Sequence, residues 1–255
     1  MLLMARFFVG ILFIFGLSLS LAVKADTLSV AVAANMQFVF DDLKVQFQRD
    51  TGHSAQGIVN SSGKLVSQIS HGAPFDVFLS ADVNFPEVLH RKGQAYSAPR
   101  VYAFGALVVW TQREIDVLKW QQVLSGGQVK KVAVANPETS PYGRESMRAL
   151  RALKIEESLR SRLVFAESIA QVNQYIHSGV VDWGITAKSV VLSDEMKGKG
   201  KWIDIPGHAY TPIAHAVVIL QHAKKNKLLT AQAFVDFLSS ASGRAILQKH
   251  GYTLP

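Results

Sequence analysis

Short apolar runs alternate with helical patterns along the first part of the chain. Residues 28–33 form an almost continuous apolar run, as is typical of a strand buried on both faces. Apolar positions then recur at helical spacing over residues 39–47. Residues 55–59 and 76–80 repeat the strand pattern on either side of a second helical stretch, residues 65–69. This βαβαβ order predicts a mostly parallel sheet covered by helices.

The same alternation returns in the second half of the chain. Residues 131–135 and 163–165 read as strands, and each leads through a polar turn into a helical pattern. Residues 180–186 read as a further strand. Residues 231–250 carry a helical pattern with a break expected near Ser242, and we expect this segment to pack back on the first part of the chain.

Two longer apolar runs, residues 101–110 and 212–220, frame an internal segment of the chain. Runs of this length are suited to crossing from one lobe to another. We therefore predict a second lobe, residues 106–216, inserted into a first lobe made of residues 26–105 and 217–255. Two crossover strands would form the hinge.

Candidate ligand-binding residues gather at four strand-to-helix turns. They are Asn35, Ser61 with Ser62, Tyr142 with Gly143, and Ser168 with Ile169. Ligands of doubly wound sheets bind outside the carboxyl ends of the strands, and the free N–H groups of a helix N-terminus attract anions. Two lobes facing each other would aim four such ends into one cleft, which predicts a small anion bound by neutral donors. The alternative interpretation is that each turn is only a capped helix.

The Ser62-Gly63-Lys64 sequence resembles part of a phosphate-binding P-loop, but its spacing excludes that motif. The P-loop pattern needs Gly where Ile58 stands and Ser or Thr where Leu65 stands. Neither the glycine-rich loop nor the magnesium-binding hydroxyl is therefore present.

Residues 1–25 have the pattern of a secretory signal peptide. Arg6 precedes an uncharged, mostly apolar run over residues 7–23, and small residues around Ala25 form a cleavage-like site. We expect cleavage after Ala25 and a periplasmic mature protein; an uncleaved membrane anchor is the alternative. The chain has no Cys, so a lipidated cysteine cannot anchor it.

The composition restricts the kinds of functional site and partner that the chain can have. The absence of Cys among 255 residues excludes thiolate metal sites and Cys nucleophiles. Arg6 and Lys24 are the charged residues of the signal segment, so its removal lowers the formal net charge from +8 to +6. Two lysine clusters, near residues 199 and 225, lack aromatic interleaving and any nucleic-acid motif. We therefore expect no nucleic-acid partner.

A secreted serine hydrolase is the alternative from a different functional class. It would need Ser61 or Ser62 in a triad with a His and an Asp, yet the sequence has neither a G-x-S-x-G elbow nor an H-E-x-x-H helix. His215 lies in an apolar strand and is interpreted as a core or hinge histidine rather than a ligand. We predict no catalytic residues and no enzyme activity.

Five segments together carry a family resemblance. They are VAVAANM (30–36), NSSGKLVSQISHGAPFDVFLSAD (60–82), ANPETSPYG (135–143), AESIAQV (166–172) and HGYTLP (250–255). With them the chain, from Leu28 to Pro255, resembles the periplasmic molybdate-binding proteins of molybdate ABC transporters. The resemblance implies an α/β, two-lobed type II periplasmic binding protein fold, in which each lobe is a mostly parallel sheet flanked by helices and two crossover strands join the lobes.

The resemblance also implies a function. A dehydrated molybdate or tungstate dianion would be held between the lobes by hydroxyls and backbone N–H groups, without cofactor, basic side chain or direct metal-ion ligand. The protein would be a monomer that delivers the anion to a membrane permease. The implied ligand-binding residues are Ala34, Asn35, Ser61 and Ser62 of the first lobe, and Tyr142, Ser168 and Ile169 of the second, with Tyr142 and Ile169 mainly giving backbone N–H groups.

The chain departs from the family pattern at two positions. Many relatives have Ser where this chain has Asn35, and many have Tyr where it has Ala187. Tyr142 then resembles the re-sited tyrosine of a subgroup, whose hydroxyl would replace the missing phenol. A sulfate or phosphate receptor of the same fold stays the nearest alternative, because these anions are also tetrahedral and cavity size must separate them.

Overall fold

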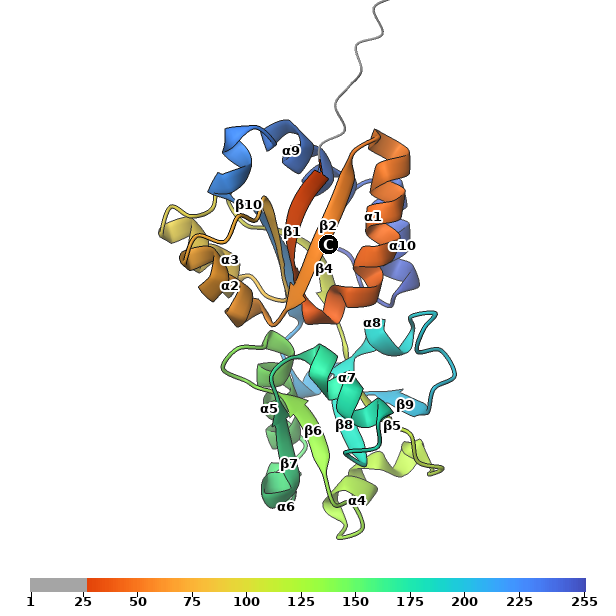
Figure 1. Cartoon of the computed structure of the whole chain (residues 1–255). Helices are drawn as coiled ribbons and strands as arrows, with labels where there is room; N and C mark the ends of the chain where they lie inside the picture. The colour runs from red at the N-terminus through yellow and green to blue at the C-terminus, as the bar shows by residue number, and fades with distance from the viewer. Residues whose placement is uncertain (1–26) are drawn as a thin grey trace, which may run out of the picture.

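The computed structural model describes residues 27–255 as two five-stranded sheets, one above the other in Figure 1, each flanked by helices. We call the sheet drawn at the top, with its helices, lobe 1 and the other lobe 2. The signal peptide expected over residues 1–25 lies outside the described residues. No helix in the described part is long and apolar enough to cross a membrane.

Lobe 1 contains a sheet of strand order β2-β1-β3-β10-β4. Its strands are β1 (Thr27–Ala33), β2 (Ser54–Asn60), β3 (Val77–Ser80), β4 (Arg100–Gly105) and β10 (Ile213–Ile219). Its helices are η1 (Ala34–Met36), α1 (Gln37–Thr51), α2 (Ser62–Ser70), α3 (Asn84–Arg91), η5 (Gln221–Lys225), α9 (Leu228–Phe237) and α10 (Ala241–Lys249). β1 pairs in parallel with β2 and β3, whereas β10 is antiparallel to both β3 and β4.

Lobe 2 repeats this plan with the order β7-β6-β8-β5-β9. Its strands are β5 (Leu107–Thr111), β6 (Val132–Ala135), β7 (Leu163–Ala166), β8 (Trp183–Ala187) and β9 (Lys201–Asp204). Its helices are η2 (Val117–Lys119), α4 (Trp120–Ser125), α5 (Pro141–Ala152), α6 (Glu156–Leu159), η3 (Arg160–Arg162), α7 (Ile169–His177), α8 (Lys188–Val191) and η4 (Gly207–Ala209). In this sheet β5 is antiparallel to both of its neighbours, β8 and β9, whereas β6 pairs in parallel with β7 and β8. The prediction of two mostly parallel sheets flanked by helices is confirmed.

Both faces of the lobe 1 sheet are covered, which explains the continuous apolar run of β1. Leu28, Val30 and Val32 enter one core with apolar residues of α1, α9 and α10. Ala31 points the other way, into a core shared with α2 and α3. A strand buried on both faces leaves its carboxyl end as the place where polar groups can meet a ligand.

The two hinge segments differ from the expected pair of crossover strands. The first run is divided at Ala106, so that β4 ends in one sheet and β5 begins in the other. The second run does not cross, because β10 pairs along its length with strands of lobe 1. The second connection is therefore the non-strand segment 205–212, and the expected division at residue 217 falls inside β10.

Two element boundaries also differ from expectation. β8 begins at Trp183 rather than at residue 180, because the Asp182 carboxylate accepts hydrogen bonds from the N–H groups of Lys130 and Lys131 and fixes a turn there. The C-terminal helical pattern breaks before Ser242: Ser240 caps α10, and its hydroxyl accepts the N–H of Gly243 at 3.1 Å.

The segment after α10 returns to the hinge. Thr253 and Phe104 of β4 exchange two backbone hydrogen bonds, at 2.8 and 3.0 Å. This pairing places Tyr252, which is almost fully buried, against the start of the connection between the lobes.

Candidate functional site

A small cavity lies where the two lobes meet, beyond the carboxyl ends of β1, β2 and β3 in lobe 1 and of β6 and β7 in lobe 2. It offers about 180 Å³ of empty space, part of which is open to solvent. Its lining consists of Ala33, Ala34, Asn35, Ser61, Ser62 and Ala81 from lobe 1, and Ser140, Pro141 and Ile169 from lobe 2. A space of this size suits an ion of a few atoms and excludes peptides, sugars and nucleotides.

The cavity brings together most of the residues proposed from the sequence. Ala34, Asn35, Ser61, Ser62 and Ile169 line it. The other two proposed residues, Tyr142 and Ser168, stand next to lining residues in the chain but are not in the lining themselves. Sequence reasoning missed Ala33, Ala81, Ser140 and Pro141. A Ser followed by Pro is a helix-start signal that identifies the last two.

The serines at the start of α2 are not explained by helix capping. Ser61 occupies the N-cap position, but its side chain makes no capping hydrogen bond. Its Oγ is buried and has no hydrogen-bond partner among the described residues. The Oγ of Ser62 accepts the N–H of Ala81 at 3.2 Å, which leaves its own O–H free to donate. A buried hydroxyl without a partner is costly, so both serines are suited to donate to a ligand in the cavity.

Lobe 2 offers backbone donors at the starts of two helices. In α5, Pro141 has no N–H, and Ser140 accepts the N–H of Gly143 at 3.3 Å. Tyr142 therefore keeps the free N–H of this first turn. In α7, Ser168 acts as the N-cap and accepts the N–H of Gln171 at 3.4 Å, so the Ile169 N–H stays available. Ser168 thus has a capping role.

The electrostatics of the cavity come from neutral groups and helix ends. None of its described lining residues is charged. The nearby cations are paired across the lobes: Lys64 with Glu167, and Arg144 with Asp82 at 2.5 Å. Among residues 27–255, no group of three or more His, Asp or Glu could hold a metal ion. The helix N-termini supply partial positive charge, so the arrangement favours a bare anion.

The lobes touch directly beside the cavity. The Gly63 N–H donates to the carbonyl of Thr139 in lobe 2 at 2.9 Å. A Cβ at position 63 would lie 3.0 Å from the Thr139 Cα, which is closer than such contacts normally are. Glycine at this position therefore permits the close approach of the two lobes.

A buried polar cluster lies behind the cavity and spans both lobes. We define it as Asn35, Tyr142, Ser189, His215 and Tyr252. The Tyr142 hydroxyl lies 3.2 Å from His215 Nε2 and takes the space that a side chain at Gly105 would need. This hydroxyl therefore contacts His215 instead of lining the cavity, and the expected replacement of the missing phenol is not seen.

Burial controls the ionisation of His215. It lowers the pKa of the ring from 6.5 to about 3, and the aromatic groups that surround it are the uncharged Tyr102, Tyr142 and Tyr252. The same burial raises the pKa of Tyr252 to about 12. Neutral donors and acceptors thus make up this cluster at ordinary pH.

The buried histidine predicts a loss of stability in acid. Below pH 6.5 His215 is protonated in the unfolded chain but stays neutral in the folded protein. The free energy of unfolding therefore falls as pH drops from 6.5 towards 3. Between pH 7 and pH 5 we expect a loss of about 2 kcal/mol. Urea denaturation at both pH values should show this loss in the native protein and a smaller one in His215→Gln. Equal losses in the two proteins would contradict the assignment.

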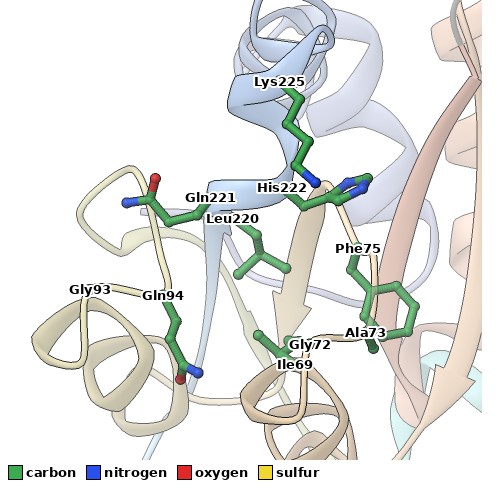
Figure 2. A pocket seen from close by; sticks show the side chains of 10 residues that line it. All are labelled: Ile69, Gly72, Ala73, Phe75, Gly93, Gln94, Leu220, Gln221, His222 and Lys225. Carbon is green, nitrogen blue, oxygen red and sulfur yellow. The ribbon is translucent and has the colours of Figure 1, made fainter.

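A larger surface pocket lies between the end of α2 and the start of β3 (Figure 2), with about 710 Å³ of empty space that includes open solvent. Apolar side chains of Ile69, Phe75 and Leu220 form its floor. The neighbouring Asp76, which precedes β3, accepts a hydrogen bond from His222 at 2.7 Å, whereas Ala81, which follows β3, lines the small cavity. The larger pocket therefore lies at the amino end of β3, away from the turns that follow β1, β2 and β3.

The similarity of this chain to known proteins extends over both sheets. A family model described as bacterial extracellular solute-binding protein matches residues 28–253. The molybdate-binding protein ModA of Azotobacter vinelandii is 37% identical over 237 residues, 92% of this chain and 93% of its own. ModA of Rhodobacter capsulatus is 32% identical over 237 residues, 92% of each chain. The solved Azotobacter vinelandii periplasmic molybdate-binding protein superposes with a TM-score of 0.83 at 32% identity, covering 89% of this chain and 99% of that one. These matches include all four turns around the cavity.

Proposed function

Because the chain belongs to the bacterial extracellular solute-binding proteins, we propose that it captures molybdate, and also tungstate, between its two lobes and delivers the anion to an ABC transporter. The fold is the two-lobed type II form expected from the sequence. The observation that carries the proposal is the buried Ser61 hydroxyl, which has no hydrogen-bond partner within residues 27–255 and borders a small cavity whose lining residues in that range are all uncharged.

Binding follows from donors on both lobes. The hydroxyls of Ser61 and Ser62 and the Asn35 amide donate from lobe 1, while the backbone N–H groups of Tyr142 and Ile169 donate from lobe 2. An anion that bridges these groups interacts better with the closed arrangement than with an open one and shifts the population towards closure. The membrane permease recognises the closed protein.

A serine hydrolase receives no support from the site. Ser62 Oγ has the Ala81 N–H as its partner, and Ser61 Oγ has none among the described residues. The buried His215 contacts Asn35 and Tyr142 instead of either serine. Neither serine is thus paired with this histidine, as a nucleophile would be with its base, and a transport receptor without catalytic residues remains our proposal.

The remaining assignments are part of the same proposal. The protein works in the periplasm as a monomer, after cleavage behind Ala25. It needs no cofactor and no metal ion other than the molybdenum of its ligand, and its partners are the oxyanion and the membrane permease. The relatives named as periplasmic or molybdate-binding proteins support this setting.

The direct test is calorimetric titration of residues 26–255 with molybdate, tungstate, sulfate and phosphate in one buffer. We expect one-to-one binding of molybdate and tungstate, and at least 100-fold weaker binding of sulfate and phosphate, because the cavity separates anions of the same shape by size. A response to sulfate or phosphate alone would keep the fold and change the ligand. Silence towards all four anions would overturn the proposal.

A further inference from the structure

Two buried polar atoms of the polar cluster have no hydrogen-bond partner among the described residues. They are Oδ1 of Asn35 and Nδ1 of His215. Asn35 is 2% exposed and His215 is fully buried, so neither atom lies at the outer surface of the protein. Buried polar atoms of this kind normally have hydrogen-bond partners, so two unsatisfied atoms within one cluster call for an explanation.

The Asn35 amide presents its two ends to different surroundings. Its Nδ2 lies 2.9 Å from the Tyr252 hydroxyl and 3.4 Å from His215 Nε2, within the cluster. Oδ1, the end without a partner, is then left for the cavity that Asn35 lines. A carbonyl oxygen there would repel the oxygens of a bound oxyanion, because both groups are acceptors.

Exchanging the two ends of the amide removes this conflict. The oxygen and the NH₂ group have nearly the same shape, so the turned side chain fits the same space. Nδ2 then faces the cavity as a donor. Oδ1 then comes within reach of the Tyr252 O–H, which turns away from Ser189 Oγ, its acceptor at 3.2 Å. Oδ1 also comes within reach of His215 Nε2. This arrangement needs a hydrogen on Nε2. Nδ1 then carries only a lone pair, so no buried N–H group of the ring is left without an acceptor.

The fold holds the His215 ring in the position that this role requires. The pairing of β10 with β4 shifts register between His215 and Ala216, and such a bulge redirects a side chain. The ring then lies edge-on to Tyr142 and Tyr252, with ring centroids 5.8 and 5.1 Å away. Gly105 leaves room beside it, since a Cβ there would lie 2.9 Å from Nε2.

We infer that His215, as the Nε2–H tautomer, is a positioning residue that turns the Asn35 amide so that Nδ2 donates to the bound oxyanion. The inference rests on the proposed function for its ligand. His215 does not touch the anion; it acts through Asn35. It also contacts Tyr142 of lobe 2, so the same N–H lies at the junction of the two lobes. Burial keeps the ring neutral, with a pKa of about 3, as the role demands.

The first test is the tautomer itself. Long-range ¹H–¹⁵N correlation spectra of the ¹⁵N-labelled native protein, with molybdate added, should show the His215 hydrogen on Nε2. A hydrogen on Nδ1 would overturn the inference. This measurement needs no variant, so it holds even where a substitution at 215 fails to fold.

The second test separates positioning from simple packing. Gln places an N–H near the position of Nε2, whereas Met fills the space without a donor. We expect His215→Met to weaken molybdate binding about 10-fold or more, and His215→Gln to stay within about 3-fold of the native protein. His250→Met, at a buried histidine that instead contacts Asp42, is the matched control and should leave the affinity unchanged.

A double-mutant cycle closes the argument. If His215 acts through Asn35, His215→Met should cause no further loss of affinity in an Asn35→Ala background. Additive losses, or equal losses for His215→Met and His215→Gln, would overturn the inference. The native protein is titrated in the same series: if it binds no oxyanion, the proposed function fails, whereas native binding with an unaffected His215→Met variant rejects the positioning role alone.

Discussion

The double substitution Ser61→Ala and Ser62→Ala is expected to weaken molybdate binding by at least 100-fold. Each hydroxyl would donate one hydrogen bond to a charged partner, and such bonds contribute about 1.5 to 3 kcal/mol each. Two of them correspond to about 10²- to 10⁴-fold in the dissociation constant. Calorimetric titration of the variant beside the native protein measures the loss.

The loss should appear in affinity far more than in folding. Ser61 Oγ has no partner among the described residues, so its removal costs the fold little. The loss of Ser62 Oγ leaves the Ala81 N–H unpaired, and we expect about 1 kcal/mol of lost stability from it. Ser67→Ala, at an exposed position of the same helix, is the control and should bind normally.

Lys64 provides a sharper control for the nature of the site. It stands one residue from Gly63, but its side chain is exposed and pairs with Glu167. Exposed ion pairs contribute at most about 1 kcal/mol, so Lys64→Ala should change the affinity less than about 5-fold. Loss of binding in Lys64→Ala would mean that a cation holds the ligand, and the account based on neutral donors would be wrong.

Valine in place of Gly63 is expected to hold the two lobes apart. The added side chain would meet the backbone of Thr139, whose Cα and carbonyl oxygen lie 3.0 and 3.1 Å from the position of the new Cβ. Backbone atoms cannot move aside as a flexible side chain does, and the 2.9 Å hydrogen bond between the lobes would also be lost. We expect molybdate binding to weaken about 10- to 100-fold.

Small-angle scattering and thermal unfolding separate this effect from misfolding. Gly63→Val should show little decrease in radius of gyration on addition of molybdate, while its unfolding temperature without ligand stays near the native value. Gly127→Val is the matched control, because a Cβ at Gly127 meets nothing within 4 Å. A Gly63→Val protein that binds and compacts normally would show that closure does not depend on this contact.

Local signals explain why part of the cavity lining could be proposed from the sequence. Asn35, Ser61, Ser62 and Ile169 stand at turns where a buried strand ends and a helical pattern begins, and short-range pattern is enough to place such turns. The rule that ligands bind outside the carboxyl ends of strands then predicted that two facing lobes would bring these turns to one cleft. Their roles in ligand binding remain proposals.

The features that sequence reasoning missed depend on contacts between distant parts of the chain. The Tyr142 hydroxyl meets His215, 73 residues away, and Asn35 meets His215 across 180 residues. Neither pairing leaves a local pattern. The register shift at His215 and the placement of β10 wholly in lobe 1 likewise arise from pairing with β4, which no window of sequence contains.

The position of β10 in the lobe 1 sheet also imposes an order on assembly. β10 separates β3 from β4, so in Figure 1 a blue strand stands among orange and yellow ones. Lobe 2 is continuous in sequence and its sheet can form as soon as β9 is available, whereas β4 has no neighbour until β10 arrives. Contacts of such long sequence separation form slowly, because chain entropy is lost before they stabilise anything. A chain that emerges N-terminus first therefore starts lobe 1 first but completes it last, when β10 and Tyr252 are available. The cavity between the lobes can form only then.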